Sequence, residues 1–140
     1  MNLPECMTEA RHIAFGDIFL EDVRAYRQTV AAELGFGALF PLWDESTSSL
    51  ADEAAGPEYQ ATVVCVDTAA LPASCAGQPY DTAFLSSLPS HVDQCGERGE
   101  FHTFVSRSPA FDRQIEFQVG QTVLRDERFG FCDLLPPVSA

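Results

Sequence analysis

One short segment of the chain concentrates side chains that can do acid–base or hydrogen-bond chemistry. Within eight residues, 96–103, it carries two carboxylates, an imidazole and a hydroxyl, together with two glycines that allow a tight turn or a close approach to a ligand. The candidate catalytic carboxylates are Glu97 and Glu100. The candidate substrate-binding residues are Gly96, Gly99, His102 and Thr103.

A plainer interpretation of the same segment is a turn whose acidic side chains are simply solvated. Residues 101–105 are apolar and β-branched, as expected of a strand that enters a core. A polar cluster at the mouth of a buried strand suits a binding site, yet composition alone favours the plain turn.

The first part of the chain predicts a strand–helix–strand pattern of α/β type. The spacing of Val23, Tyr26, Val30 and Leu34 predicts a helix, capped by Asp17 and ended by Gly35, with Tyr26 in the core. We expect the arginines of this helix to pair with Glu21, Asp22 or Glu33. Strands are predicted at residues 12–15 and 38–43, and a short helix at 46–55.

Gly56-Pro57 marks the predicted domain boundary, which divides the chain into residues 1–56 and 57–140. The second part predicts a central strand, a short helix and then several strands, with a hairpin or bulge at Gly120. The predicted fold class is α/β, with a partial parallel sheet followed by a smaller α+β domain. The ranges are 61–67, 101–105, 115–119, 121–125 and 128–132 for strands, and 81–88 for the helix.

The formal charge of −13 argues against a nucleic-acid partner or an anionic membrane surface, since both need basic patches. No membrane span or signal peptide is predicted, so a cytoplasmic location is expected. The five cysteines are odd in number and never form a C-x-x-C pair, which indicates free thiols and no metal site. Cys95 borders the acidic segment, where neighbouring acids would raise its pKa.

The segment 95–104, taken with several other motifs, resembles the diphthine–ammonia ligase family of the PP-loop ATP pyrophosphatase, or adenine nucleotide alpha-hydrolase, group. The resemblance runs from about residue 12 to residue 136. The other motifs are Phe15-Gly16-Asp17-Ile18-Phe19-Leu20-Glu21-Asp22, Tyr26-Arg27, Pro41-Leu42-Trp43, Val63-Val64-Cys65-Val66-Asp67 and Phe131-Cys132-Asp133-Leu134-Leu135-Pro136.

The resemblance implies an ATP-dependent ligase that forms an amide, AMP and pyrophosphate, with Mg²⁺ accompanying ATP. It also implies a Rossmann-like, HUP-type sheet and a protein substrate, an elongation factor. Open parallel sheets bind ligands at the carboxyl ends of their strands. A nucleotide-side crevice would therefore contain Gly16, Asp17 and Trp43.

The chain departs from the family at its beginning. It has no glycine-rich Ser-Gly-Gly-Lys-Asp-Ser loop and no lysine at all, so it resembles the C-terminal part of such an enzyme and is not expected to bind ATP by itself. Arg98 and Asp44 also differ from the residues that many relatives carry there. The alternative is a non-enzymatic fragment or an interaction module. A bare sheet edge would favour a homo-oligomer or a separate N-terminal chain.

Overall fold

The computed structural model describes residues 10–137, and their contacts divide the chain into two compact units, Met1–Glu45 and Ser46–Ala140. We describe each unit by itself. The sequence placed the boundary at Gly56-Pro57, whereas this division precedes helix α2 (Thr47–Ala54). Helix α2 falls in the second unit because Ala51 is buried in that unit's core.

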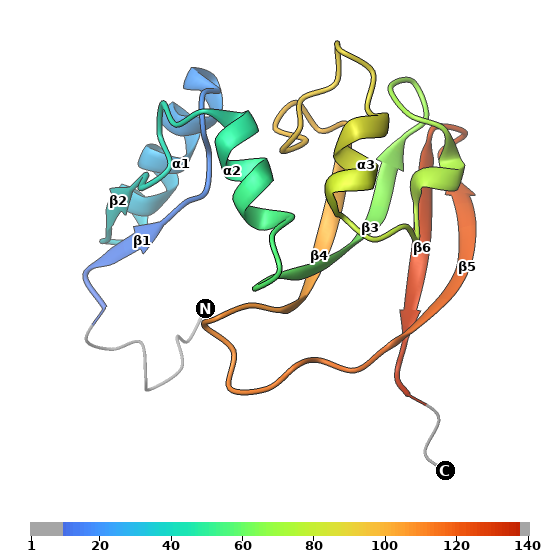
Figure 1. The fold of residues 1–140 in the computed structure, drawn as a ribbon. Coiled ribbons are helices and arrows are strands. Elements are labelled where there is room, and N and C mark those ends of the chain that lie inside the picture. The colour runs from blue at the N-terminus through green and yellow to red at the C-terminus, as the bar shows by residue number, and fades with distance from the viewer. Residues whose placement is uncertain (1–9, 138–140) are drawn as a thin grey trace. The chain divides into compact units, whose positions relative to one another are not determined.

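The first unit is a parallel strand pair joined by one helix (Figure 1). Strand β1 (His12–Ala14) pairs with β2 (Gly37–Leu39), and α1 (Glu21–Glu33) connects them. Gly35 has a φ of +80°, a left-handed conformation that ends the helix as predicted. The predicted α/β pattern is therefore confirmed for this unit.

Two predictions about helix α1 are wrong. Asp17 does not cap the helix, which begins after Leu20 without a side-chain cap; its carboxylate lies 3.6 Å from Nε of Arg27 instead. Tyr26 is 63% exposed because the helix packs on only two short strands, and its buried residue is Ala31. Arg27 therefore lies near Asp17, and not beside Glu21, Asp22 or Glu33 as expected.

The second unit contains a four-stranded antiparallel sheet in the order β4-β3-β6-β5. The predicted central strand is confirmed as β3, and the antiparallel sheet distinguishes this unit from the parallel pair of the first. After α2 come β3 (Gln60–Asp67), the short 3-10 helix η2 (Ala73–Cys75), α3 (Thr82–Ser87), β4 (Phe101–Arg107), β5 (Gln118–Arg125) and β6 (Phe129–Leu135).

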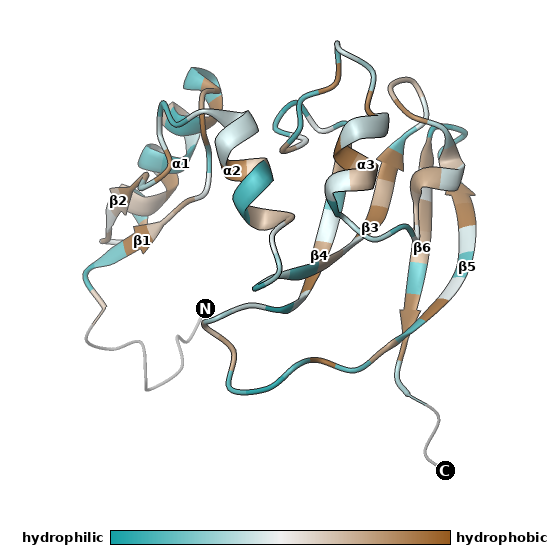
Figure 2. Cartoon of the chain, viewed as in Figure 1, coloured by the Kyte–Doolittle hydropathy of each residue, from teal (hydrophilic) through white to brown (hydrophobic). Residues whose placement is uncertain are grey.

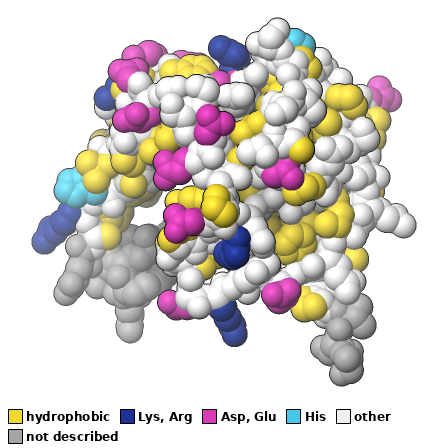
Figure 3. Space-filling model, in the orientation of Figure 1, with side chains coloured by type: hydrophobic (Ala, Val, Ile, Leu, Met, Phe, Trp, Pro, Cys, Tyr) yellow, Lys and Arg dark blue, Asp and Glu magenta, His cyan; other side chains and the backbone are white. Residues whose placement is uncertain are grey.

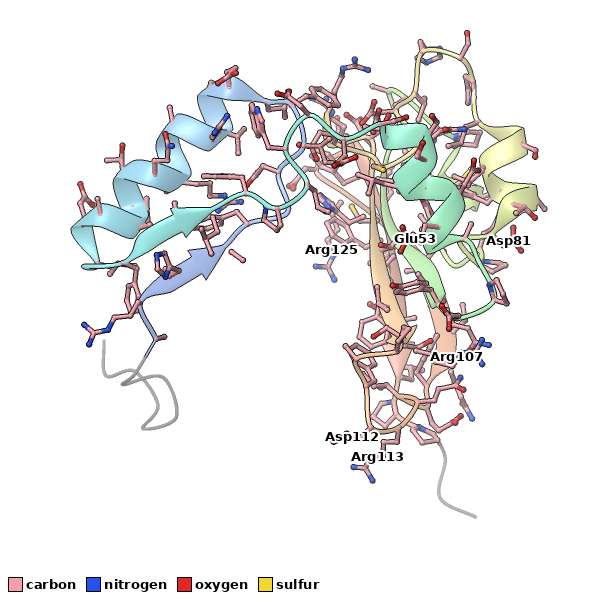
Figure 4. The ribbon with its side chains drawn as sticks, turned by 60° about the vertical axis from the view of Figure 1, so that its left-hand side comes forward. Glu53, Asp81, Arg107, Asp112, Arg113 and Arg125 are labelled. Atoms are coloured by element: carbon pink, nitrogen blue, oxygen red, sulfur yellow. The ribbon has the colours of Figure 1, made fainter. Side chains whose placement is uncertain are left out.

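Helices α2 and α3 begin at side-chain caps, since Ser46 accepts from the Ser49 amide and Asp81 from the Phe84 amide (Asp81 is labelled in Figure 4). The strand predicted at 121–125 belongs to β5, which begins only at Gln118, so residues 115–117 of the strand predicted at 115–119 lie outside it; β5 contains a bulge. Gly120 lies in this bulge, where a Cβ would approach the Asp133 carbonyl oxygen to 3.0 Å. The bulge alternative of the sequence analysis is thus confirmed.

The core of the second unit lies between the sheet and the helices that cover it. Hydropathy colouring shows brown, apolar residues gathered on β3 and α3 (Figure 2). Val63 and Val66 of β3 are fully buried, and the rings of Phe84 and Phe101 pack edge to face with centroids 5.4 Å apart. Tyr80 completes this aromatic cluster beside the loop that precedes β4.

Acidic side chains are spread over the visible surface, whereas basic ones are few (Figure 3). Among residues 10–137, no helix is long and apolar enough to cross a membrane.

Candidate functional site

The predicted catalytic segment belongs to an ordered loop between α3 and β4, residues 88–100, which we call the acidic loop. Two carboxylates hold its backbone by accepting four backbone N–H groups. Glu100 accepts from Asp93 N at 2.9 Å and from Arg98 N at 3.0 Å. Asp93 in turn accepts from Cys95 N at 2.9 Å and Glu97 N at 3.3 Å. These bonds fix the loop from inside.

The two glycines of the acidic loop are required by its backbone. Gly96 has a φ of +68° and Gly99 a φ of +85°, both in the left-handed region. At Gly96 a Cβ would also lie 2.7 Å from the carbonyl oxygen of Phe101, whereas at Gly99 it would meet open space. A close approach was expected between these glycines and a ligand. At Gly96 the close neighbour is instead the chain's own backbone at Phe101.

Two further contacts anchor the acidic loop to the rest of the unit. The Tyr80 hydroxyl donates to the Gln94 carbonyl oxygen at 2.9 Å, and burial raises the pKa of that hydroxyl well above its ordinary value. The Cys95 thiol donates to the Thr47 carbonyl oxygen at 3.2 Å. Burial, with smaller contributions from Asp93 and Glu97, raises the pKa of Cys95 to about 11. Cys95 is therefore a protonated, structural thiol at neutral pH.

The predicted site residues occupy two kinds of position in this loop and strand. Glu100 is only 8% exposed, and both its oxygens accept backbone N–H groups, whereas Glu97 is partly exposed. His102 and Thr103 are exposed at the start of β4, opposite a bulge in β3 where His102 pairs with Cys65. These residues lie close together in the sequence. Their catalytic and binding roles remain predictions.

An ion pair that the sequence analysis missed supports the base of this site. Nε and Nη2 of Arg128 donate to the two carboxylate oxygens of Asp67, and the Ala69 amide donates to Oδ1 at 3.0 Å. The Asp67 amide also donates to the Glu100 carbonyl oxygen at 2.8 Å, so the pair fixes the residue that closes the acidic loop. The hydrogen bonds from Arg128, followed by that from Ala69, lower the pKa of Asp67 to about 2.

The Asp67–Arg128 pair predicts a defined loss of stability in acid. The folded-state pKa of Asp67 lies below the ordinary 3.8. The contribution of its ionised form to the unfolding free energy is therefore complete well above pH 3.8 and is lost as pH falls from about 5 to about 2. We expect the difference in unfolding free energy between wild type and Asp67→Asn to shrink over this range in urea titrations. A difference that stays constant from pH 6 to pH 2 would contradict the assignment.

The predicted crevice residues Gly16, Asp17 and Trp43 follow the carboxyl ends of β1 and β2. The Phe15 amide donates to the Leu39 carbonyl oxygen at 2.9 Å, and the Asp44 amide to the Ile18 carbonyl oxygen at 2.9 Å. These bonds tie the two strand ends together.

The start of the neighbouring helix is acidic. The first turn of α1 carries Glu21 and Asp22, whose charges repel phosphate at a helix N-terminus. The chain also has no lysine to offset that repulsion. Within residues 10–137, no group of three or more His, Cys, Asp or Glu side chains is placed to hold a metal ion.

The cysteines at positions 65, 75, 95 and 132 are free thiols, as expected, and Cys6 lies outside the described residues. Burial raises the pKa of Cys65 and Cys75. None of these observations indicates a redox centre.

A comparison with protein families matches residues 46–136 to the model of the diphthamide synthase C-terminal domain. The match covers the second unit almost completely and includes the acidic loop, Asp67 and Arg128. No curated protein matches the chain.

Proposed function

Because the chain belongs to the family of the diphthamide synthase C-terminal domain, we propose that it supplies the substrate side of an ATP-dependent, amide-forming ligase. In this reaction class ATP activates a carboxylate, and ammonia then displaces AMP to leave an amide. The proposed substrate is a carboxylate-bearing molecule, and a protein substrate such as an elongation factor is one member of that class. The cytoplasm is the proposed location.

The observation that carries this proposal is the internal bracing of the acidic loop. Asp93 and Glu100 use carboxylate oxygens on backbone N–H groups, so the loop is held without help from a ligand. A site that is already ordered loses little entropy on binding and keeps its polar groups aimed at the reacting atoms. A merely solvated turn would not need two carboxylates bound to its own backbone N–H groups, one of them buried.

The same geometry separates the proposed roles of the two glutamates. Glu97 is partly exposed, so in the proposal it orients the attacking nitrogen or accepts its proton. The Glu100 carboxylate is buried on backbone donors and acts as a positioning residue for the loop. His102 and Thr103, exposed on β4, would donate hydrogen bonds to the substrate.

In this proposal the nucleotide is held by a segment that carries the Ser-Gly-Gly-Lys-Asp-Ser loop. The parallel β1–β2 pair would belong to a larger Rossmann-like, HUP-type sheet that such a segment completes. That segment could be part of the same protein or a separate chain, and association of copies through the strand edges is the other way to cover them. No step involving ATP or Mg²⁺ is assigned to the residues described.

The test combines this chain with a polypeptide that carries the phosphate-binding loop and measures AMP and amide formation. We expect turnover only in the combination, and no micromolar binding of Mg-ATP to this chain alone by calorimetry. Glu97→Gln keeps the shape and removes the charge, so it should lower kcat about 100-fold with an unchanged melting temperature. Glu58→Gln, an exposed glutamate elsewhere in the unit, is the matched control.

Two outcomes would count against the ligase assignment. Activity of Glu97→Gln close to wild type would return the acidic loop to a structural turn. Stable complex formation without any turnover would favour the alternative, a non-catalytic interaction module.

A further inference from the structure

We infer that Arg24 of the first unit is a receptor for a single oxyanion, a carboxylate or a phosphate group of a small ligand. The inference does not depend on ligase chemistry, because it concerns binding alone. It rests on the position of the guanidinium, on its missing partners and on its place beside the strand ends.

Aromatic rings hold the Arg24 guanidinium in place. Its Cζ lies 4.2 Å from the centroid of the Trp43 ring and 5.2 Å from that of Phe40. Phe40 itself stacks on Phe15 at 5.6 Å and meets Trp43 edge to face at 6.1 Å. Stacking leaves the planar edge of a guanidinium available for bidentate hydrogen bonds while it fixes the orientation of that edge.

Within the part of the chain that the structure describes, Arg24 has no acidic partner, although the chain is strongly acidic. Arg27 lies within ion-pair distance of Asp17, and Arg128 pairs with Asp67, but no carboxylate among residues 10–137 lies within that distance of Arg24. Its Nε atom is buried and makes no hydrogen bond, so a ligand would have to be bound through the terminal amino groups of the guanidinium. With 21 acidic residues against eight basic ones, an uncompensated, partly buried cation indicates a donor set kept for a ligand.

The location is one where ligands commonly bind. Trp43 and Phe40 follow β2, and Phe15 follows β1, so the aromatic cluster lies at the carboxyl ends of two parallel strands. Glu21 and Asp22 stand in the first turn of α1, close in sequence to Arg24, and oppose a highly charged ligand. The site therefore suits one carboxylate or one phosphate group better than a triphosphate.

The test uses the fact that Trp43 is the only tryptophan of the chain, so its fluorescence reports on the Arg24 stack directly. The full chain is titrated with benzoate in one arm and with inorganic phosphate in the other. We expect a saturable change in at least one arm, and the arm that saturates identifies the anion class. Arg24→Gln should weaken that binding at least about tenfold, as expected when a charged donor is removed.

Two variants control for charge and for folding. Arg11→Gln removes the same charge from an exposed position in the same unit and should change the dissociation constant less than about twofold. Arg24→Lys keeps the charge and the fold but loses the planar guanidinium that can donate two parallel hydrogen bonds. It should therefore bind the anion more weakly than wild type by calorimetry. Absence of a saturable response to either anion, or equal affinity of wild type and both Arg24 variants, would overturn the inference.

Discussion

Glu100→Gln is expected to lose about 2 kcal/mol of unfolding free energy, because a glutamine offers one acceptor oxygen where the carboxylate offers two. In the wild type, Oε1 accepts from Asp93 N and Oε2 from Arg98 N. The amide NH₂ of glutamine would face one of these N–H groups, and two donors would then oppose each other in a buried place. The acidic loop should loosen at Asp93 and at Arg98.

The measurement is urea denaturation together with amide hydrogen exchange at Asp93 and Arg98. Exchange at these two amides should accelerate in Glu100→Gln and stay slow in Glu97→Gln, which is the matched control because the Glu97 side chain accepts neither of these N–H groups. Stability and exchange equal to wild type would show that the carboxylate does not hold the loop. Activity data on Glu100 variants must therefore be interpreted together with their stability, whereas Glu97 variants test chemistry.

Local patterns were sufficient to predict most elements of the second unit. The β-branched run of β3, the caps Ser46 and Asp81, and the glycine at the β5 bulge each act within a few residues, so their effect is visible in the sequence. The turn between β5 and β6 was harder to predict from the sequence. Asp126 and Glu127 both adopt positive φ, at 52° and 54°, without the glycine that usually marks such a turn.

Long-range pairing explains what the sequence did not predict about the site. Asp67 and Arg128 are 61 positions apart, and nothing local to either residue identifies its partner. The sequence analysis did not single out Asp93, yet this residue braces the acidic loop through short-range hydrogen bonds that depend on the exact backbone path. The sequence analysis named Glu97 and Glu100 together as candidates, and only the structure distinguishes the partly exposed Glu97 from the buried Glu100.

Helix α1 shows how tertiary context overrides periodicity. Tyr26 shares the apolar spacing of the helix but is exposed, while Arg24 stacks on Trp43. A pattern of hydrophobic residues predicts a buried face only where enough structure exists to cover it. In this unit the only sheet that could cover helix α1 among the described residues is two strands of three residues each. Aromatic residues that follow these strands supply the remaining packing.

Gly96→Ala is expected to lose about 3 kcal/mol of unfolding free energy, because strain and steric overlap act together. The φ of +68° disfavours any Cβ, and the added carbon would lie 2.7 Å from the Phe101 carbonyl oxygen, a backbone atom of the strand edge that cannot rotate away. Relief would require the acidic loop to move from Phe101, which would disturb the N–H bonds that Asp93 and Glu100 accept.

Gly99→Ala provides the matched control, since its φ of +85° is similar but a Cβ there meets no atom within 4 Å. It should lose only about 1 kcal/mol, the penalty of the left-handed conformation alone. Thermal and urea unfolding of both variants measure the difference. Equal losses of unfolding free energy in the two variants would mean that the contact with Phe101 is relieved at little cost. The acidic loop would then be more flexible than its hydrogen bonds indicate. A larger loss at Gly96 would show that the loop and β4 form one rigid support for Glu97.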